Sequence, residues 1–447
     1  MRKINLSQLV LAALLLVVTI FASCKKTETP TPPKPPANTL PNTITDDGGG
    51  IGTQTWEAGK TYILDGFCFV NSGQTLTIEA GAIIKGKSGQ GAEASALIVA
   101  RGGKILAEGT ASDPIIFTAE ADDLKGSVPN DASGLWGGLI VLGNAKLNTI
   151  PAEQQIEGIP TTEPRGAYGG TNDNDNSGIL KYISIRHGGT DIGDGNEING
   201  LTLGGVGSKT EIGYIEVLSN ADDGIECFGG MPNLKHILIS GCKDDGLDYD
   251  QGFRGNVQFY CVLNTDGDRC GEHDGGTNPE DGEPYAIPTI FNATYIGTGN
   301  ADARIIVFRD NAGGYYYNSL FVDCLKGGIE IEKLASGECS YSRFENGQLK
   351  VENNVFYNIS GETTNSNPNA FIKSGKDGTA TEDTELATYF TTAKNIVANP
   401  GVSVTNPVPS TPQTTDMASY PAGFENVAYK GAFGSTNWAQ GWTATFN

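Results

Sequence analysis

Three patterns are scarce in this 447-residue chain, and each absence excludes a class of protein. The apolar spacing of amphipathic helices is almost absent, which argues against a helical bundle. The 61 glycines follow no Gly-X-Y period, which excludes a collagen-like rod. Only three histidines occur, far apart, and no Cys-x-x-Cys pair is present, so the sequence holds no zinc-binding pattern.

Positive charge is also scarce. Lysine and arginine number 30 against 52 acidic residues, which gives a formal net charge of −22. A surface this acidic repels nucleic acid, so we expect no nucleic-acid partner. It suits divalent cations and neutral or basic partners, although solubility alone would also account for it.

The N-terminus has the features of an export signal. The apolar run Leu9–Phe21 is too short to span a bilayer stably and predicts a signal peptide over residues 1–23. Phe-Ala-Ser-Cys24 resembles a bacterial lipobox, although leucine is usual where Phe21 stands. We expect Cys24 to carry lipid, with an ordinary secretory signal as the alternative.

Residues 24–50 are predicted to form an extended tether, because they are rich in Pro, Thr and Lys and lack apolar periodicity. At roughly 3.1 Å per residue the tether reaches on the order of 60 Å. The chain is therefore expected to be an outer-membrane lipoprotein that faces the periplasm or the cell surface, with the membrane as a partner through its lipid.

A period of 22 residues organises the middle of the chain. Asp222, Asp244 and Asp266 follow one another at this spacing. Each copy holds an alternating β run, an Asn/Asp/Gly corner and a second alternating run, which is typical of a solenoid. The sequence thus predicts an all-β fold, a right-handed parallel β-helix solenoid over residues 51–360.

Long insertions and a cap complete the predicted architecture. The polar segments 150–177 and 271–288 are predicted to be inserted loops, which are often functional when this long. Residues 361–447 are predicted to cap the C-terminal end, with helical spacing over 382–397. Three aromatic residues of the tail are expected to pack on the last coil: Phe433, Trp438 and Trp442.

The chain resembles the right-handed parallel β-helix surface lipoproteins of Bacteroidota, which share the pectin-lyase-like superfold. The resemblance is carried by the phrases at residues 185–189, 222–226, 248–254, 271–275 and 308–312. It implies a fold and an envelope location. The wider superfold includes lyases and polygalacturonases of acidic polysaccharides, but their Gly-His-Gly and Arg-Ile-Lys motifs are missing here.

Acidic residues are predicted to gather on one outer face. Strand alternation points Glu226, Asp248 and Asp250 outward, and adjacent coils lie about 4.8 Å apart. Like charges so close must share a proton, pair with arginine or bind a cation. We predict calcium, because it takes oxygen ligands and is plentiful outside cells. The expected ligands are Glu226, Asp248, Asp250, Asp223 and Asp245.

Two other roles are open to these charges. The corner aspartates suit backbone capping, which leaves Asp223 and Asp245 freer to bind metal. The corner set is Asp222, Asp244, Asp266 and Asp302. Four arginines are available to neutralise the acidic face: Arg254, Arg269, Arg304 and Arg309.

The segment 271–276 is the best candidate for catalysis, because it groups two carboxylates with an imidazole. His273 there could act as general base or acid, and a loop histidine that bonds locally is the alternative. The candidate catalytic residues are His273, Glu272, Asp248 and Arg254. Of the seven cysteines beyond Cys24, most are expected to be buried apolar residues, and a Cys261–Cys270 bridge is an open alternative.

Three functions remain open. The first is binding of a glycan or another extracellular ligand, through calcium. The second is a polysaccharide lyase or glycoside hydrolase acting on an acidic polysaccharide, and the third is a passive scaffold for envelope proteins. The concentration of ionisable groups around residues 214–276 argues against a scaffold, and the lack of a complete catalytic motif argues against an enzyme. Binding is therefore preferred.

Overall fold

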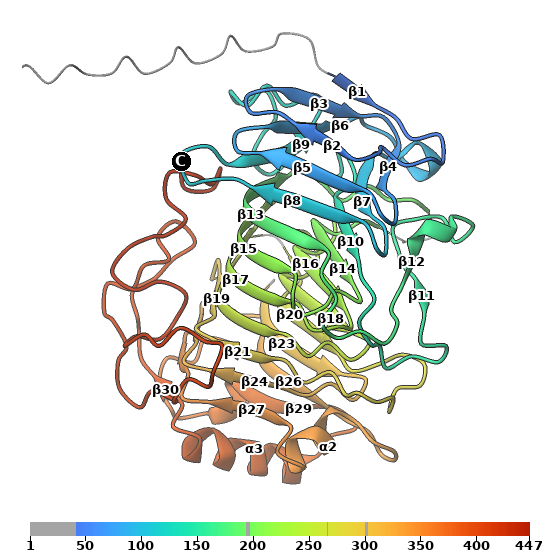
Figure 1. Cartoon of the computed structure of the whole chain (residues 1–447). Coiled ribbons are helices and arrows are strands. Elements are labelled where there is room, and N and C mark those ends of the chain that lie inside the picture. Colours follow the sequence, from blue (N-terminus) through green and yellow to red (C-terminus); the bar gives the residue numbers. More distant parts are fainter. Residues whose placement is uncertain (1–41, 194–196, 266, 300–302) are drawn as a thin grey trace, which may run out of the picture. The chain divides into compact units, whose positions relative to one another are not determined.

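The computed structural model describes residues 42–447 except 194–196, 266 and 300–302 (Figure 1). The predicted signal peptide, Cys24 and most of the tether lie outside the described residues, as do Asp266 and Asp302. Within the described part, no helix combines the length and apolar character needed to cross a membrane.

The chain winds into a right-handed parallel β-helix, as the 22-residue period predicts (Figure 1). Each coil contributes a strand to each of three parallel runs, of which two belong to one large sheet and the third forms a sheet of its own. The first run holds β2 (Gln54–Trp56), β5 (Thr75–Glu79), β8 (Lys104–Glu108), β13 (Gly178–Arg186), β15 (Glu211–Leu218), β17 (Asn233–Ser240), β19 (Asn256–Asn264), β21 (Thr289–Phe291), β24 (Gly314–Tyr317) and β27 (Leu349–Glu352).

The second run shares the far halves of the long strands β13 to β19. Its other members are β1 (Asn42–Ile44), β3 (Thr61–Leu64), β6 (Ile83–Gly86), β9 (Ile115–Ala119), β22 (Thr294–Gly297), β25 (Leu320–Val322), β28 (Val355–Tyr357) and β30 (Ile396–Val397). The third run, called sheet B, holds β4 (Phe67–Val70), β7 (Ala96–Val99), β10 (Leu139–Leu142), β14 (Leu201–Gly204), β16 (Ile225–Phe228), β18 (Leu247–Asp250), β20 (Arg269–Asp274), β23 (Arg304–Arg309), β26 (Gly327–Lys333) and β29 (Ile372–Lys376). The paired strands thus extend beyond the predicted limits of 51 and 360.

Alternation along the strands builds one continuous core inside the coils. In β5, Leu76 and Ile78 are buried while Glu79 faces out. The same side of each later coil adds further apolar residues, so the core runs from Trp56 to Phe390. Stacking is required because a single coil leaves its inner face uncovered above and below.

The long strands bend at one residue with a left-handed backbone, a conformation that suits Asn but strains bulky side chains. In later coils the bend residue is asparagine: Asn292, Asn318 and Asn353. In the middle coils it is aromatic: Tyr182, Tyr214, His236 and Phe259. The rings of successive bends stack with centroids 4.3, 4.3 and 4.8 Å apart, and this stacking offsets the strain.

The C-terminal strap, residues 398–447, runs along the outside of the bent strands (red in Figure 1). Gln258 exchanges two hydrogen bonds of 2.8 Å with the backbone of Glu425, and Asn292 donates to the Tyr429 carbonyl. Trp442 packs edge-on against Tyr182. The expectation that the tail covers the last coil is therefore wrong, because its tryptophans lie over the aromatic bends of middle coils.

Glu216 on β15 anchors the end of the strap. This buried carboxylate accepts the backbone N–H groups of Ala444 and Thr445 at 2.9 and 2.8 Å, and also the Thr445 hydroxyl. We expect Glu216→Gln to place an amide donor against these donors and to lower the unfolding free energy by about 1.5–3 kcal/mol.

Hydrogen exchange and urea unfolding together test this anchor. Amides near Thr445 should exchange faster in Glu216→Gln. The control is Glu211→Gln on the same strand, where an exposed pair with Lys181 is worth at most about 1 kcal/mol. Unchanged protection of residues 440–446 in Glu216→Gln would contradict the anchor.

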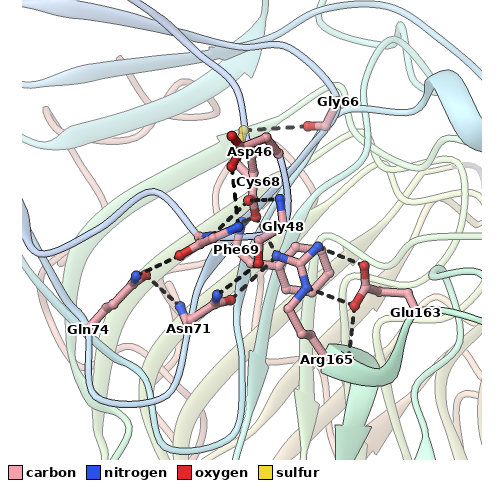
Figure 2. A network of polar contacts seen from close by, with 12 residues as sticks. Asp46, Gly48, Gly66, Cys68, Phe69, Asn71, Gln74, Glu163 and Arg165 are labelled. Carbon is pink, nitrogen blue, oxygen red and sulfur yellow. Dashed lines mark hydrogen bonds and ion pairs between the residues drawn. The ribbon is translucent and has the colours of Figure 1, made fainter.

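An arginine clip fastens the first inserted segment to the first coils (Figure 2). Arg165 pairs with Glu163 through two nitrogens at 2.7 Å and with Asp46 at 2.6 Å, and its guanidinium lies 3.8 Å from the centroid of the Phe69 ring. Burial raises the pKa of Asp46, but hydrogen bonds from Gly48, Arg165 and other groups lower it below the usual value overall. The insertion, which contains β11 (Gln154–Gln155), η2 (Pro164–Gly166) and β12 (Ala167–Tyr168), is therefore fixed to the coils.

Two helices cover the C-terminal end of the solenoid (Figure 1). They are α2 (Ser340–Glu345) and α3 (Ala380–Thr392), and η3 (Pro368–Ala370) lies against α3. The other short helix, η1 (Gly91–Glu93), belongs to an early coil. A capping box of Thr379 and Glu382 begins α3. Buried Phe390 packs on Phe371 and Phe356, so the helix expected within residues 382–397 forms at residues 380–392. Residues 398–447 of the predicted capping region instead form the strap along the side of the coils.

Candidate functional site

Three carboxylates stand in register on the outer face of sheet B. Glu226 of β16 pairs with Asp248 of β18, and Asp248 pairs with Glu272 of β20. Their strand neighbours point into the core, as the alternation predicts. The three residues are nevertheless only 8, 9 and 8% exposed, so they are covered rather than displayed.

Two corner aspartates extend this set into an acidic ladder, defined as Asp223, Glu226, Asp245, Asp248 and Glu272. Asp223 is buried, and its carboxylate accepts the backbone N–H of Asp245 in the next coil at 2.8 Å. Asp223 thus also caps the backbone of the next coil, a role that was expected of the corner residue before it.

The ladder contains two overlapping trios that share Asp248. The upper trio is Asp223, Glu226 and Asp248, and the lower trio is Asp245, Asp248 and Glu272. In each trio one oxygen per residue lies within 4.8 Å of the others. This is a spacing at which carboxylate oxygens can share a cation.

Burial and mutual repulsion raise the pKa values of the ladder. Burial, followed by the charge of Glu157 and then of Asp248, holds the pKa of Glu226 well above its usual value. Burial and the charge of Asp223 do the same for Asp248. Burial and Glu272 raise the pKa of Asp245 to about 8, although Arg269 opposes them. The ladder therefore favours bound protons or a cation over free negative charge.

Arginines compensate only the lower trio. Arg269 contacts Asp245 at 3.1 Å and Glu272 at 2.8 Å, and Arg309 contacts Glu272 at 3.1 Å. The ion pairs that described arginines make with the ladder all fall on this half. The upper trio instead meets the amide of Asn199 and the carboxyl of Glu157.

Sequence reasoning missed Glu157 and Asn199. Asn199 is fully buried and donates to Glu226 at 2.7 Å and to Glu157 at 3.0 Å, while its Oδ1 has no hydrogen-bond partner among the described residues. Glu157 belongs to the first insertion, which has no periodicity. The only signal available was the rule that long loops in a solenoid are often functional.

The structure corrects the assignment of His273. Residues 269–274 form β20 rather than a loop, and the register opposite Tyr249 turns His273 into the core. Its ring is fully buried, stacks on Tyr249 at 4.1 Å and contacts the Tyr316 hydroxyl at 2.6 Å through Nε2. Burial lowers its pKa to about 3. A ring enclosed in this way cannot reach an external substrate.

Two further assignments are corrected. Arg254 donates to the Gly252 carbonyl and pairs with Asp173, so it does not serve the ladder. Asp250 faces outward but accepts from Gln251 and Thr277, and it belongs to neither trio. Burial and the charge of Asp274 raise the pKa of Asp250 to about 6.

The cysteines form no bridge among the described residues. All seven that follow Cys24 are free and buried, as expected for apolar residues. Cys270 lies in the core with its sulfur 3.9 Å from that of Cys324, whereas Cys261 belongs to the cluster under the strap. The alternative of a Cys261–Cys270 bridge is therefore wrong.

His273→Phe is expected to change stability and leave ligand binding intact. The neutral ring donates from Nδ1 to the Glu272 carbonyl and accepts from Tyr316 at Nε2, and phenylalanine loses both bonds. The unfolding free energy should fall by about 1–3 kcal/mol in urea titrations. Loss of calcium or glycan binding at unchanged stability would show that His273 serves the ligand site and is not only a core residue.

Comparison with known proteins finds a family match over the part of the chain that forms the β-helix. Residues 49–443 match the family model of the pectate-lyase-like beta-helix domain. No curated protein and no solved structure shows a significant match. The family match includes the coils, both insertions and most of the strap, and it fits a carbohydrate-related function.

Proposed function

The chain belongs to the pectate-lyase-like beta-helix domain family, and on this premise we propose that it is an outer-membrane lipoprotein that binds an extracellular glycan through calcium held in the acidic ladder. The observation that carries the proposal is the upper trio, three buried carboxylates in contact without an arginine. Cys24 would carry the lipid, and the tether would hold the β-helix away from the membrane.

The residues of the upper trio fit a calcium ion. Calcium takes six to eight oxygen ligands, and the trio offers carboxylate oxygens from Asp223, Glu226 and Asp248. The Oδ1 atoms of Asp248 and Asn199 are buried and have no partner among the described residues. Oxygens of this kind are costly to bury unless a donor or a cation reaches them. Bound calcium would supply the positive charge that the upper trio lacks.

The lower trio fits a cation less well. The guanidinium of Arg269 already bridges Asp245 and Glu272, so positive charge is present there. We therefore place a single calcium in the upper half. Glu157 would then connect the ion to the first insertion, because it shares the Asn199 amide with Glu226.

Binding is favoured over a lyase or hydrolase by the positions of the candidate catalytic groups. The proposed base His273 is inside the core, and Arg254 is paired elsewhere. Glu272 is held by Arg269 and Arg309, so Asp248 is the only one of the four candidate catalytic residues that is neither inside the core nor held in an ion pair among the described residues. A passive scaffold would have no need of buried carboxylates stacked against one another.

Polysaccharide binding by the full chain in detergent micelles tests the proposal. Neutral and acidic polysaccharides would be screened with calcium chloride and with EDTA, and unsaturated or reducing ends would be measured in the same samples. We expect calcium-dependent binding without new ends. Release of ends would favour the lyase or hydrolase, and binding that EDTA does not change would separate the glycan from calcium.

A further inference from the structure

A small polar hollow lies away from the ladder contacts described above. It has a volume of about 150 Å³ and lies where the segment 122–130, the end of β13 and the C-terminal strap meet. Its polar lining consists of Asp122, Asn130, Arg186, His187 and Asn447. A hollow of this volume holds several water molecules, which is the size range of a small organic ligand.

Arg186 is exceptional among the arginines that the structure describes, because it alone has no carboxylate partner. The other described arginines all form ion pairs: Arg101, Arg165, Arg254, Arg269, Arg304, Arg309 and Arg343. Arg186 uses only Nε, which donates to the Ser184 hydroxyl at 2.8 Å. In a chain with a net charge of −22, a guanidinium left without a carboxylate points to an anion from outside.

Asp122 lines the same hollow but makes no ion pair with this guanidinium. Its Oδ2 accepts from the Thr118 hydroxyl and its Oδ1 from the backbone N–H of Leu124, both at 2.7 Å. The Ser184 hydroxyl, in turn, donates to Glu216, which anchors the strap. The Arg186 side chain is thus held at its Nε by a fixed network, and its two terminal nitrogens remain for a ligand.

His187 adds an acceptor beside the guanidinium. Its Nδ1 lies 2.7 Å from the Ala132 carbonyl and donates to it, so the neutral ring presents Nε2 as an acceptor. Burial lowers the pKa of His187, which keeps the ring neutral near pH 7. The hollow therefore combines donors for an oxyanion with an acceptor for a hydroxyl.

We propose that this hollow binds a small hydroxylated carboxylate, the chemical class of the sugar acids. The terminal nitrogens of Arg186 pair with the carboxylate, a planar group that matches the guanidinium in two parallel hydrogen bonds. His187 accepts from a hydroxyl. The proposal rests on the proposed glycan-binding function only for the nature of the ligand, since the hollow and the ladder share no residue.

Titration calorimetry on the full chain in detergent tests the hollow with sodium gluconate, sodium acetate and glycerol. We expect gluconate to bind with a dissociation constant on the order of 1 mM, acetate more weakly and glycerol not measurably. Arg186→Gln should raise the gluconate constant at least tenfold. Arg101→Gln is the matched control, because it removes an arginine whose carboxylate partner is Glu153.

A second variant protects the test against misfolding of Arg186→Gln. Val128 also lines the hollow, so Val128→Phe should fill it and abolish gluconate binding while the guanidinium stays in place. Equal gluconate binding by Arg186→Gln and wild type, or equal binding of glycerol and gluconate, would overturn the proposal. If the polysaccharide screen finds no calcium-dependent glycan binding and gluconate still binds in the hollow, the result contradicts the proposed function and leaves the inference about the hollow in place.

Discussion

Calcium is expected to raise the melting temperature of the full chain in detergent, relative to EDTA. Extracellular calcium modules bind with constants of about 10⁻⁴ to 10⁻³ M. If the upper trio lies at the tighter end, 10 mM calcium is about 100 times the constant and stabilises the folded state by about 2.7 kcal/mol. The physical reason is that the ion replaces the repulsion among Asp223, Glu226 and Asp248 by attraction.

Asp248→Asn gives this prediction its sharpest test. The substitution removes one of the stacked charges, so in EDTA the variant should melt at a higher temperature than wild type. It also removes the carboxylate common to both trios, so the calcium-induced rise should vanish. Glu272→Gln, in the arginine-compensated half, is the matched control and should keep the rise. An equal calcium effect in Asp248→Asn and wild type would exclude the upper trio.

In EDTA, stability is expected to fall as the pH rises from about 4 to 8. Burial raises the pKa of Asp250 to about 6, of Asp222 to about 7 and of Asp245 to about 8. Between the unfolded values near 4 and these folded values, the native state binds more protons than the unfolded chain. Each such group therefore lowers the unfolding free energy by about 1.4 kcal/mol per pH unit within its own window.

The sign of this dependence is opposite to that of a carboxylate stabilised by an ion pair, which gains stability as the pH rises. Urea unfolding at pH 5 and pH 8 measures it directly. Asp250→Asn should remove the part of the slope that lies between about pH 4 and 6. Calcium should reduce the further part of the slope that comes from the upper trio, whose carboxyl pKa values burial also raises, because it competes with protons for the oxygens of those residues. Stability that increases steadily from pH 5 to 8 in EDTA would show that these buried carboxyls are not protonated in the native state.

The sequence predicted the features that depend on short periods. The 22-residue spacing of Asp222 and Asp244 predicts the solenoid, because each coil must repeat the same corner. Alternation predicts that Glu226 and Asp248 face outward, because the neighbours Ile225 and Leu247 must face the core. These two facts alone require the carboxylates of Glu226 and Asp248 to stack one coil apart.

The residue composition of one segment led to a wrong prediction, because strand pairing decided its structure. Gly271, Glu272 and Asp274 have the composition of a loop, yet parallel partners on both sides make the segment a strand. Once it is a strand, His273 must alternate inward. A histidine can occupy the core because Tyr316 and a backbone carbonyl satisfy both its ring nitrogens.

By itself, the sequence determined the coil, its inward and outward faces and the acidic column, since these follow from local repetition and from the burial of apolar side chains. Only the tertiary structure decided how that column is covered and neutralised. The approach of Glu157 from an insertion and the docking of Trp442 on Tyr182 both join residues far apart in sequence. No periodicity encodes such contacts, because they depend on where aperiodic segments close onto the finished coils.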